Sequence, residues 1–402
     1  MRKHRSDRVI LAVALILMAI GLIVIYAIGP MRANFLNSVL GRQAYKEQGF
    51  FVHQLITVLA SIVAMIIGFK FPYQVTRKAA KWVLLAGLVS CILLAILAFG
   101  HSSLASCQLG GCRWFRLGSF NFQPAELLKM GVIMYMAQLI RERKAEGKLE
   151  ESSDFWVPYV VVGVLALLLV VVVQKDGGTG VVIAAILLAM LLESGVSFKK
   201  IGLVCAVVIA LGIMAVLTSP HRMERLLTFG GKGDASKSYH IKNAMMAIGT
   251  GGLFGVGVGN SVQATGYLPE SINDSVFAVM GETFGFLGLM AVMGCFAILL
   301  MRLLKIADAT RDEEQKLVVV GVFAWMATHV LINVAAMTGL MPLSGITLPL
   351  LSYGGTSMVF ISLALGVCLQ LSCYTEREVK NESIDSRRRL GGTYNASRSR
   401  RA

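Results

Sequence analysis

The stretch from Tyr267 to Glu282 places a carboxylate, Asp274, at the entrance of an apolar helix. Acidic side chains are costly next to hydrocarbon, so an acid at this position indicates a functional site. Asp274 suits a general base or a ligand of a divalent metal ion. Glu270 and Glu282 would favour its protonated form if they lie close in space. Asn273-Asp-Ser275 is also a good helix cap, so a structural function stays open.

A second charged pair, Glu126 and Lys129, stands one turn into an apolar helix that begins at Pro124. Proline fits the first turn of a helix, where its missing N–H group costs nothing. If this helix starts on the outer side, its free N–H groups and positive dipole end offer a seat for an anion. The spacing of three puts both side chains on one helix face. A structural intramembrane ion pair carries about equal weight.

Two glycine-rich turns complete the candidate site. Gln174-Lys-Asp-Gly-Gly-Thr-Gly180 has the composition of a local tight turn, and it offers Lys175 and Asp176 as groups that support a substrate. In the segment 339–357, two prolines and a Gly-Gly pair break the helix at the outer edge of two spans. Broken backbone at that depth lines a cavity or is buried against protein, and the hydroxyl of Ser352 either binds a ligand or supports the loop.

The elements that position these residues are membrane helices. With 56% hydrophobic residues, 15% charged residues and a mean hydropathy of +0.70, the chain is not an ordinary soluble globule. We expect an all-α integral membrane protein with one domain over residues 1–374 and a basic, disordered cytoplasmic tail over 375–402. Apolar runs long enough to span a bilayer lie near 9–28, 51–69, 82–100, 124–140, 157–174, 178–194, 201–218, 276–301, 317–337 and 353–374, ten in all.

Lysine and arginine set the predicted orientation. The loops on the N-terminal side carry 18 of these residues before the tail adds eight, and the other side carries 11. The positive-inside rule therefore places both termini in the cytoplasm and the long 219–275 loop, between the seventh and eighth spans, outside. The net charge of +15 reflects this bias and contact with anionic lipid, and no aromatic-basic platform for nucleic acid is present. Six of the outer cations flank the conspicuous carboxylates, which suits either an anionic ligand or a solvated loop.

Two local patterns in the outer loops carry further predictions. Cys107 and Cys112 share one outer loop, and a disulfide between them is favoured over a zinc site, which would need more ligands than His101. The glycine-dense run 244–259 suits a re-entrant or surface-lying element whose backbone approaches its neighbours closely.

The motifs together resemble the SEDS family, the FtsW and RodA type of peptidoglycan polymerase. The resemblance covers the whole chain except its two ends. It rests on Arg113-Trp114 with Phe122-Gln-Pro, on Tyr267-Leu-Pro-Glu-x-x-x-Asp274 with Gly281-Glu282, and on Leu348-Pro-Leu-x-Ser-Tyr-Gly-Gly355.

The resemblance implies a ten-helix enzyme of the bacterial cytoplasmic membrane that polymerises lipid II on the outer face. The nascent glycan on undecaprenyl pyrophosphate is the donor, and a sugar hydroxyl of lipid II attacks with inversion to form a β-1,4 bond. Asp274 matches the essential aspartate, acting as general base or as ligand of a divalent cation, Mg or Mn. Glu126 and Lys129 match a functional pair. The implied substrate-binding residues are Arg113, Gln123, Lys175, Asp176, Glu270, Glu282 and Ser352.

Some positions depart from the family pattern, including Asn273 in place of threonine and Ser344-Gly345 in place of a Lys-Gly pair. None of them changes Asp274. Thr347 and the run Gly255–Gly259 favour the division branch, similar to FtsW, over the elongation branch. The resemblance implies as partners a class B penicillin-binding transpeptidase, division-complex proteins and membrane lipid. A lipid II flippase and a non-catalytic division scaffold are the competing functions.

Overall fold

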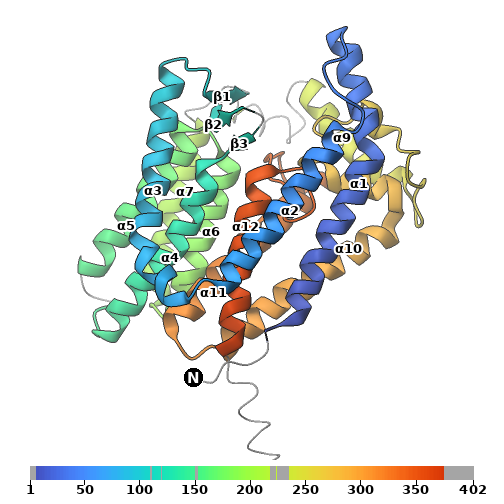
Figure 1. Ribbon diagram of the computed structural model, residues 1–402. Helices are drawn as coiled ribbons and strands as arrows, with labels where there is room; N and C mark the ends of the chain where they lie inside the picture. Colours follow the sequence, from blue (N-terminus) through green and yellow to red (C-terminus); the bar gives the residue numbers. More distant parts are fainter. Residues whose placement is uncertain are drawn as a thin grey trace, which may run out of the picture.

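The computed structural model describes residues 6–108, 111–118, 120–149, 153–217, 223 and 235–374. These residues form a bundle of long helices with one small sheet at its end (Figure 1). The helices are α1 (Arg8–Leu40), α2 (Gly49–Lys70), α3 (Tyr73–Phe99), α4 (Pro124–Ala145), α5 (Ser153–Leu167, continued by a π-helical turn, Leu168–Val173), α6 (Gly177–Ser194), α7 (Phe198–Leu217), α9 (Ala235–Thr250), α10 (Val276–Ala309), α11 (Glu313–Met337) and α12 (Gly355–Leu371).

By length and composition, eight helices within the described residues can cross a membrane: α1, α2, α3, α5 with its π-turn, α6, α10, α11 and α12 with the 3-10 turn that follows. The predicted spans 124–140 and 201–218 correspond to α4 and α7, which are not among these eight. Most of α4 is buried by other helices, Lys129 included, so the charged side chains Glu126 and Lys129 are shielded from lipid. The chain is therefore a multi-pass membrane protein, and ten spans remain a prediction.

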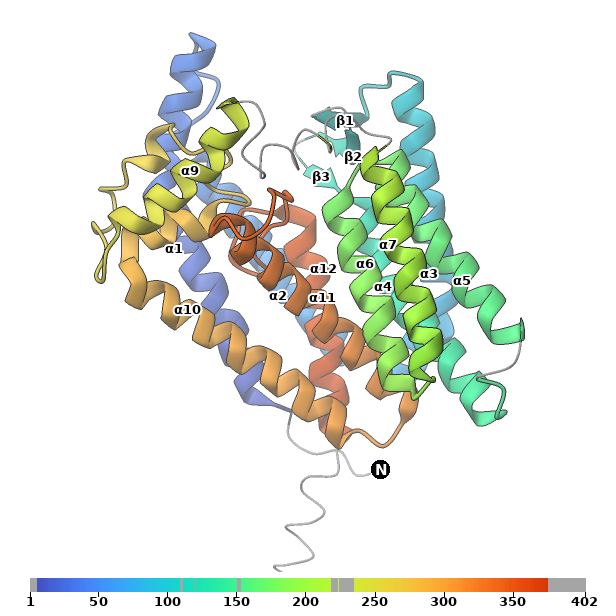
Figure 2. The same cartoon turned by 180° about the vertical axis from the view of Figure 1, so that it is seen from behind.

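The two ends of the bundle differ in character. At one end the chain begins and α12 stops, where the backbone N–H of Asp7 donates to Ser372 Oγ at 3.0 Å. The same Asp7 pairs with Arg302 at 2.8 Å, near the end of α10. The opposite end carries the sheet and α9 (Figures 1 and 2). The tail 375–402 and the loop cations Arg222, Arg225 and Lys232 lie outside the described residues.

Glycine allows the helices that hold the site to approach closely. A Cβ atom added to Gly87 of α3 would lie 2.8 Å from the Cα of Leu128, and one added to Gly131 of α4 would lie 2.6 Å from the Cα of Leu84. Gly366 of α12 similarly lies against the carbonyl of Met65 in α2. Membrane helices have no hydrophobic driving force for association within lipid, so small residues at their crossings let the backbones approach and gain packing contacts. These crossings fix α4 and α12 in the bundle.

The glycine-dense run docks on a broken helix, as its composition predicted. α10 leaves helical geometry at Gly285, whose φ is +68°, a conformation that favours glycine. Backbone groups of α10 near this break form hydrogen bonds with the glycine-dense run 244–259. Phe286 N–H donates to the Gly252 carbonyl at 2.8 Å, and Val256 N–H donates to the Glu282 carbonyl at 2.9 Å. A Cβ at Gly255 would lie 2.2 Å from the Thr283 carbonyl oxygen.

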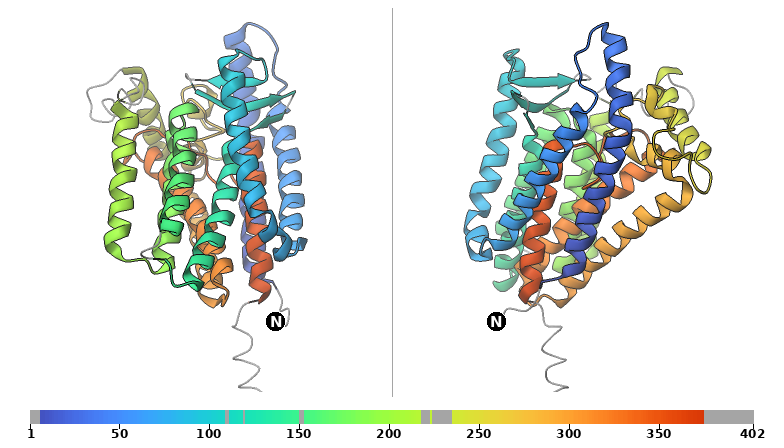
Figure 3. Two further views of the ribbon diagram at one scale, coloured as in Figure 1. Left: turned by 90° about the vertical axis from the view of Figure 1, so that its left-hand side faces the viewer. Right: turned by 45° about the vertical axis from the view of Figure 1, so that its right-hand side comes forward.

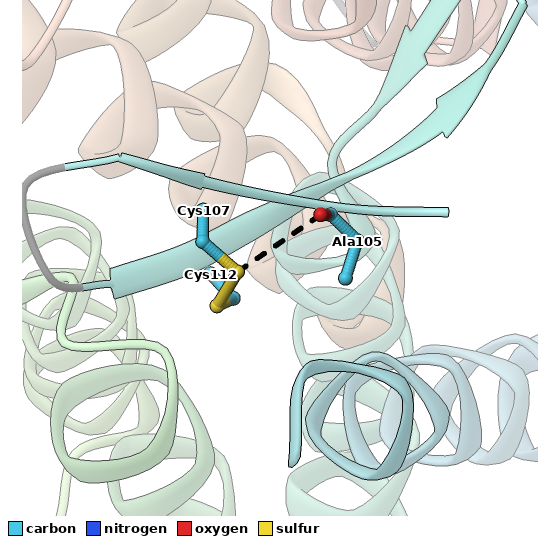
Figure 4. Close-up of a disulfide and its surroundings, with 3 residues drawn as sticks. All are labelled: Ala105, Cys107 and Cys112. Carbon is cyan, nitrogen blue, oxygen red and sulfur yellow. Dashed lines mark hydrogen bonds between the residues drawn. A yellow bond between two sulfur atoms is a disulfide. The ribbon is translucent and has the colours of Figure 1, made fainter. Parts of the chain in front are cut away.

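A small antiparallel sheet covers the opposite end of the bundle from the N-terminus, with strands β1 (Ala105–Gln108), β2 (Gly111–Leu117) and β3 (Phe120–Phe122) in that order (Figure 3). Cys107 faces Cys112 across the first strand pair, and the two form the predicted disulfide (Figure 4). The zinc alternative therefore does not apply to these cysteines. The sheet leads from β3 directly into α4, and so places the start of that helix.

Candidate active site

The connection between α11 and α12, residues 338–354, is the point where the predicted motifs meet. Asn333 of α11 donates one amide hydrogen to the carbonyl of Asp274 at 2.7 Å and the other to the carbonyl of Ile346 at 2.6 Å. Tyr353 N–H donates to the carbonyl of Ile272 at 2.9 Å. The broken segment is thus attached at two points to the stretch that carries the candidate aspartate.

The first turn of α12 and the same connection contact the other two motifs. The backbone N–H of Gln123, just before α4, donates to Thr356 Oγ1 at 3.3 Å. A Cβ added to Gly178 in the α5–α6 turn would lie 2.9 Å from the Ser344 carbonyl oxygen. Four segments that are far apart in the chain therefore form one site at the end of the bundle that carries the sheet.

Asp274 lies two residues before α10 and is partly buried. The N-cap residue of α10 is Ser275, and its side chain makes no capping hydrogen bond. The Ser275 hydroxyl instead lies 3.0 Å from the Pro269 carbonyl and 2.7 Å from His240 Nε2. Asp274 Oδ1 lies 3.4 Å from the Ser275 hydroxyl. The structure thus gives no support to the capping interpretation of this stretch.

Glu126 and Lys129 form a buried ion pair below this site. Lys129 Nζ lies 2.9 Å from Glu126 Oε1, and the two side chains are 0% and 3% exposed. The ammonium also stands over the Trp325 ring, 4.6 Å from its centroid. Glu126 Oε2 is buried and has no hydrogen-bond partner within the described part of the chain. A buried carboxylate oxygen that is left unpaired costs free energy, so this pair has one free acceptor directed into the protein.

His329 connects that pair to the broken connection. Its Nε2 atom lies 3.3 Å from Lys129 Nζ and 3.2 Å from Trp325 Nε1, and both of these groups are donors. Its Nδ1 atom lies 3.2 Å from the Thr347 carbonyl, which can only accept. The partners therefore assign the neutral ring with its proton on Nδ1 and a lone pair on Nε2.

Asp176 organises the α5–α6 turn. Its carboxylate accepts from Thr179 N–H at 3.1 Å and from the Thr179 hydroxyl at 2.9 Å, which caps α6. Gln123 Nε2 donates to its Oδ2 at 3.4 Å, and Arg113 Nε lies 4.0 Å from that oxygen. Arg113 also donates to the Lys175 carbonyl at 3.0 Å. This turn brings two predicted substrate residues together, and the Lys175 side chain is exposed beside them.

The side chains of three predicted site residues form hydrogen bonds within loops of the structure. Glu282 is 2% exposed and accepts from the Ser261 hydroxyl and from the N–H groups of Val262 and Gln263. Glu270 is exposed, has a φ of +50° and bonds the Asn273 amide. Ser352 accepts from Leu348 N–H at 2.9 Å within its own loop. Through these hydrogen bonds the three side chains stabilise the loops around the site.

Tyr353 supplies a neutral phenol beside these loops. Burial, with a smaller contribution from Tyr45, raises the pKa of Tyr353 to about 12. Its hydroxyl therefore stays protonated at neutral pH and can donate a hydrogen bond.

The donor set limits how a metal ion can bind here. Within the described residues, no three His, Cys, Asp or Glu side chains group closely enough to hold an ion. Mg²⁺ usually takes one or two carboxylates together with phosphate oxygens of a substrate. A divalent ion at Asp274 would therefore take its remaining ligands from water or from a bound substrate.

Sequence reasoning missed three residues of α11: Trp325, His329 and Asn333. A signal was present, because the three are spaced by four and so share one helix face. That face is polar within a helix that is otherwise apolar, which indicates a surface turned toward the site.

Comparison with known proteins identifies the family. A family model described as "Cell cycle protein", for FtsW, RodA and SpoVE, matches residues 7–377. A probable peptidoglycan glycosyltransferase FtsW of Nitrosomonas europaea is 33% identical over 94% of this chain and 95% of its own length. Stage V sporulation protein E of Bacillus subtilis is 29% identical over 93% and 99%. The chain therefore belongs to the FtsW, RodA and SpoVE family, and it is a multi-pass protein of the bacterial cytoplasmic membrane.

Solved structures share the fold. A chain of a structure described as "Structural coordination of polymerization and crosslinking by a peptidoglycan synthase complex" superposes with a TM-score of 0.70 at 20% identity, covering 91% of this chain and 97% of that one. The rod shape determining protein RodA of Thermus thermophilus superposes with a TM-score of 0.65 at 20% identity, covering 92% and 98%.

Proposed function

We propose that this chain is a peptidoglycan glycosyltransferase that joins lipid II units into β-1,4-linked glycan on the outer face of the cytoplasmic membrane, for the septal wall of a dividing cell. The observation that carries the proposal is the attachment of Asp274, through Asn333, to the broken connection between α11 and α12. The same connection contacts His329 through the Thr347 carbonyl, and His329 contacts Lys129 of the buried Glu126–Lys129 pair.

The reaction requires a general base and a binding site for the pyrophosphate leaving group. Asp274 takes the proton from the acceptor sugar hydroxyl, the hydroxyl oxygen bonds to the anomeric carbon of the donor, and the bond from that carbon to the pyrophosphate oxygen breaks. Attack on the face opposite the leaving group inverts the anomeric carbon. Arg113 and Lys175 attract the pyrophosphate, and Asp176 orients Arg113. In the alternative function of Asp274, its carboxylate would hold a divalent ion, and that ion would neutralise charge on the leaving group.

The proposed orientation places ten spans in the membrane, with α4 and α7 added to the eight apolar helices and both termini in the cytoplasm. Two observations support it. The two ends of the described chain lie together, as an even number of spans requires, since Asp7 contacts Ser372. The ion pairs of Lys144 with Glu313 and of Lys316 with Glu193 join helix ends that the predicted orientation places at the cytoplasmic side. The long loop that precedes Asp274 is then extracytoplasmic.

The proposed partner is a class B penicillin-binding transpeptidase within a division complex. The likeness of the fold to a chain of a peptidoglycan synthase complex supports this partner. Names of relatives favour the division branch over the elongation branch, in agreement with Thr347.

Reconstitution separates polymerase from flippase. Purified protein in liposomes, given fluorescent lipid II and Mg²⁺ or Mn²⁺, is expected to yield glycan that lysozyme digests. A flippase would instead move lipid II between leaflets without forming polymer, and that result would refute the proposal. Addition of the class B partner tests whether the rate depends on it.

A further inference from the structure

We propose that α11 positions two groups of the site. Asn333 fixes the position of Asp274, and His329, one turn earlier, fixes the position of the Lys129 ammonium. This inference rests on the proposed function and adds two residues that contact no reacting atom. Their spacing of four places both on one face of α11, directed at two different parts of the site.

Asn333 acts through the backbone of Asp274. Both of its amide hydrogens are used, one on the Asp274 carbonyl and one on the Ile346 carbonyl, and the residue is 1% exposed. Because Asp274 lies before the first turn of α10, this contact on its carbonyl restrains the backbone from which its side chain starts. A displacement of about 1 Å at a catalytic group costs on the order of 100-fold in rate.

His329 acts through the ammonium of Lys129. The lone pair on Nε2 accepts from Lys129 Nζ, and the Thr347 carbonyl holds the ring in the tautomer that keeps this lone pair. Without that acceptor the ammonium would have Glu126 and the Trp325 face as its remaining partners. The ammonium would then shift toward Glu126, away from the connection that carries Thr347.

Three variants and one control test the inference. Asn333→Asp keeps the shape but removes both donors, and we expect kcat to fall about 10- to 100-fold with KM changed less than about threefold. His329→Gln keeps an acceptor and is expected to retain most activity, whereas His329→Phe removes it and is expected to lose about tenfold or more. Tyr73→Phe is the matched control, because it removes a buried hydrogen bond to Glu314 at the opposite end of the bundle.

The outcomes are distinguishable. If Asn333→Asp raises KM and leaves kcat unchanged, or if His329→Gln and His329→Phe lose activity equally, the positioning inference is wrong. If all variants lose activity in proportion to their lower unfolding temperature, as Tyr73→Phe then also would, the residues are merely structural. If the unsubstituted chain forms no polymer, the proposed function itself fails.

A second inference rests on a separate cavity between α5 and α7. We infer that it binds an acyl chain of an anionic phospholipid from the inner leaflet. The cavity holds about 500 Å³ and is lined by apolar side chains, among them Val160, Val204 and Leu211. Lys200 is the cation in its lining and stands 5.5 Å from the centroid of the Trp156 ring. No acidic side chain of the described residues pairs with Lys200.

The dimensions match one leaflet. From Lys200 to Leu211, α7 rises about 16 Å at 1.5 Å per residue, which is close to half of the roughly 30 Å hydrocarbon thickness. Lys200 lies in the first turn of α7, a few residues after Glu193, which pairs with Lys316 at the end proposed to be cytoplasmic. Basic pockets between helices at that surface attract anionic headgroups, so the acyl chain has an apolar path and the headgroup has a cation.

Nanodiscs of phosphatidylcholine, with or without phosphatidylglycerol, test this site. Phosphatidylglycerol is expected to raise the unfolding temperature of the full chain, and Lys200→Gln is expected to remove at least half of that rise. Lys199→Gln is the matched control, because Lys199 is exposed and does not line the cavity. Val204→Trp fills the space and is expected to abolish the rise while both charges remain. Equal effects of the two lysine variants, or a full rise in Val204→Trp, would overturn the inference.

Discussion

The buried pair of Glu126 and Lys129 offers a quantitative test of whether these charges stabilise the fold or serve the reaction. Both are essentially inaccessible, with Nζ and Oε1 2.9 Å apart. Removal of one partner leaves the other charge buried without compensation, which costs about 3–5 kcal/mol. The Trp325 ring offsets part of this cost for Lys129, on the order of 2 kcal/mol. We therefore expect Lys129→Met to destabilise more than Glu126→Gln does.

The double variant Glu126→Gln/Lys129→Met separates the two functions. Apolar or neutral side chains that replace a whole buried pair are often neutral or stabilising, so we expect the double variant to recover most of the stability lost in the single variants. We expect its polymerisation rate to stay at least about 100-fold below that of the unsubstituted chain. Denaturant unfolding in detergent and polymer yield measure the two quantities. Recovery of both would mean that the pair is structural only, and the account of the site would be wrong.

Other substitutions test how the loops and helices hold the site. Glu282→Ala leaves the donors of Ser261, Val262 and Gln263 without their acceptor, at about 1–3 kcal/mol for each buried group, and limited proteolysis is expected to cleave residues 256–265 faster. Unchanged proteolysis would contradict that assignment. Gly131→Leu pushes α3 and α4 apart, because its Cβ would lie 2.6 Å from the Leu84 Cα, so both the unfolding temperature and the activity are expected to fall. A variant as stable as the parent chain would refute the close crossing. Removal of the disulfide by Cys107→Ser/Cys112→Ser opens only a short loop, so a loss of about 2 kcal/mol or less is expected, measured by unfolding. A larger loss would show that the sheet depends on the bond.

The sequence predicted the helical architecture better than it predicted what each residue contacts. Apolar runs and broken segments are local features, so the spans and the four motifs could be found from composition and spacing. The partners of Glu282 and Asn333 come from segments distant in sequence, which no local pattern reveals. Glu282 stabilises the loop 261–263, because that loop presents backbone N–H groups that need an acceptor, and its contact with substrate stays a prediction. Asn333 shares a helix face with Trp325 and His329, but that spacing does not reveal which segments its amide bonds.

Asp274 is the centre of this account, and one isosteric substitution tests it most directly. Asp274→Asn keeps the size of the side chain and removes its charge, with Asp308→Asn, an exposed acid near the far end of α10, as control. The account predicts that Asp274→Asn lowers the rate of glycan formation from lipid II by at least about 100-fold, while unfolding and binding to the class B partner stay unchanged. Asp308→Asn is expected to polymerise at the parent rate. Glycan formed at the parent rate by Asp274→Asn would contradict the account.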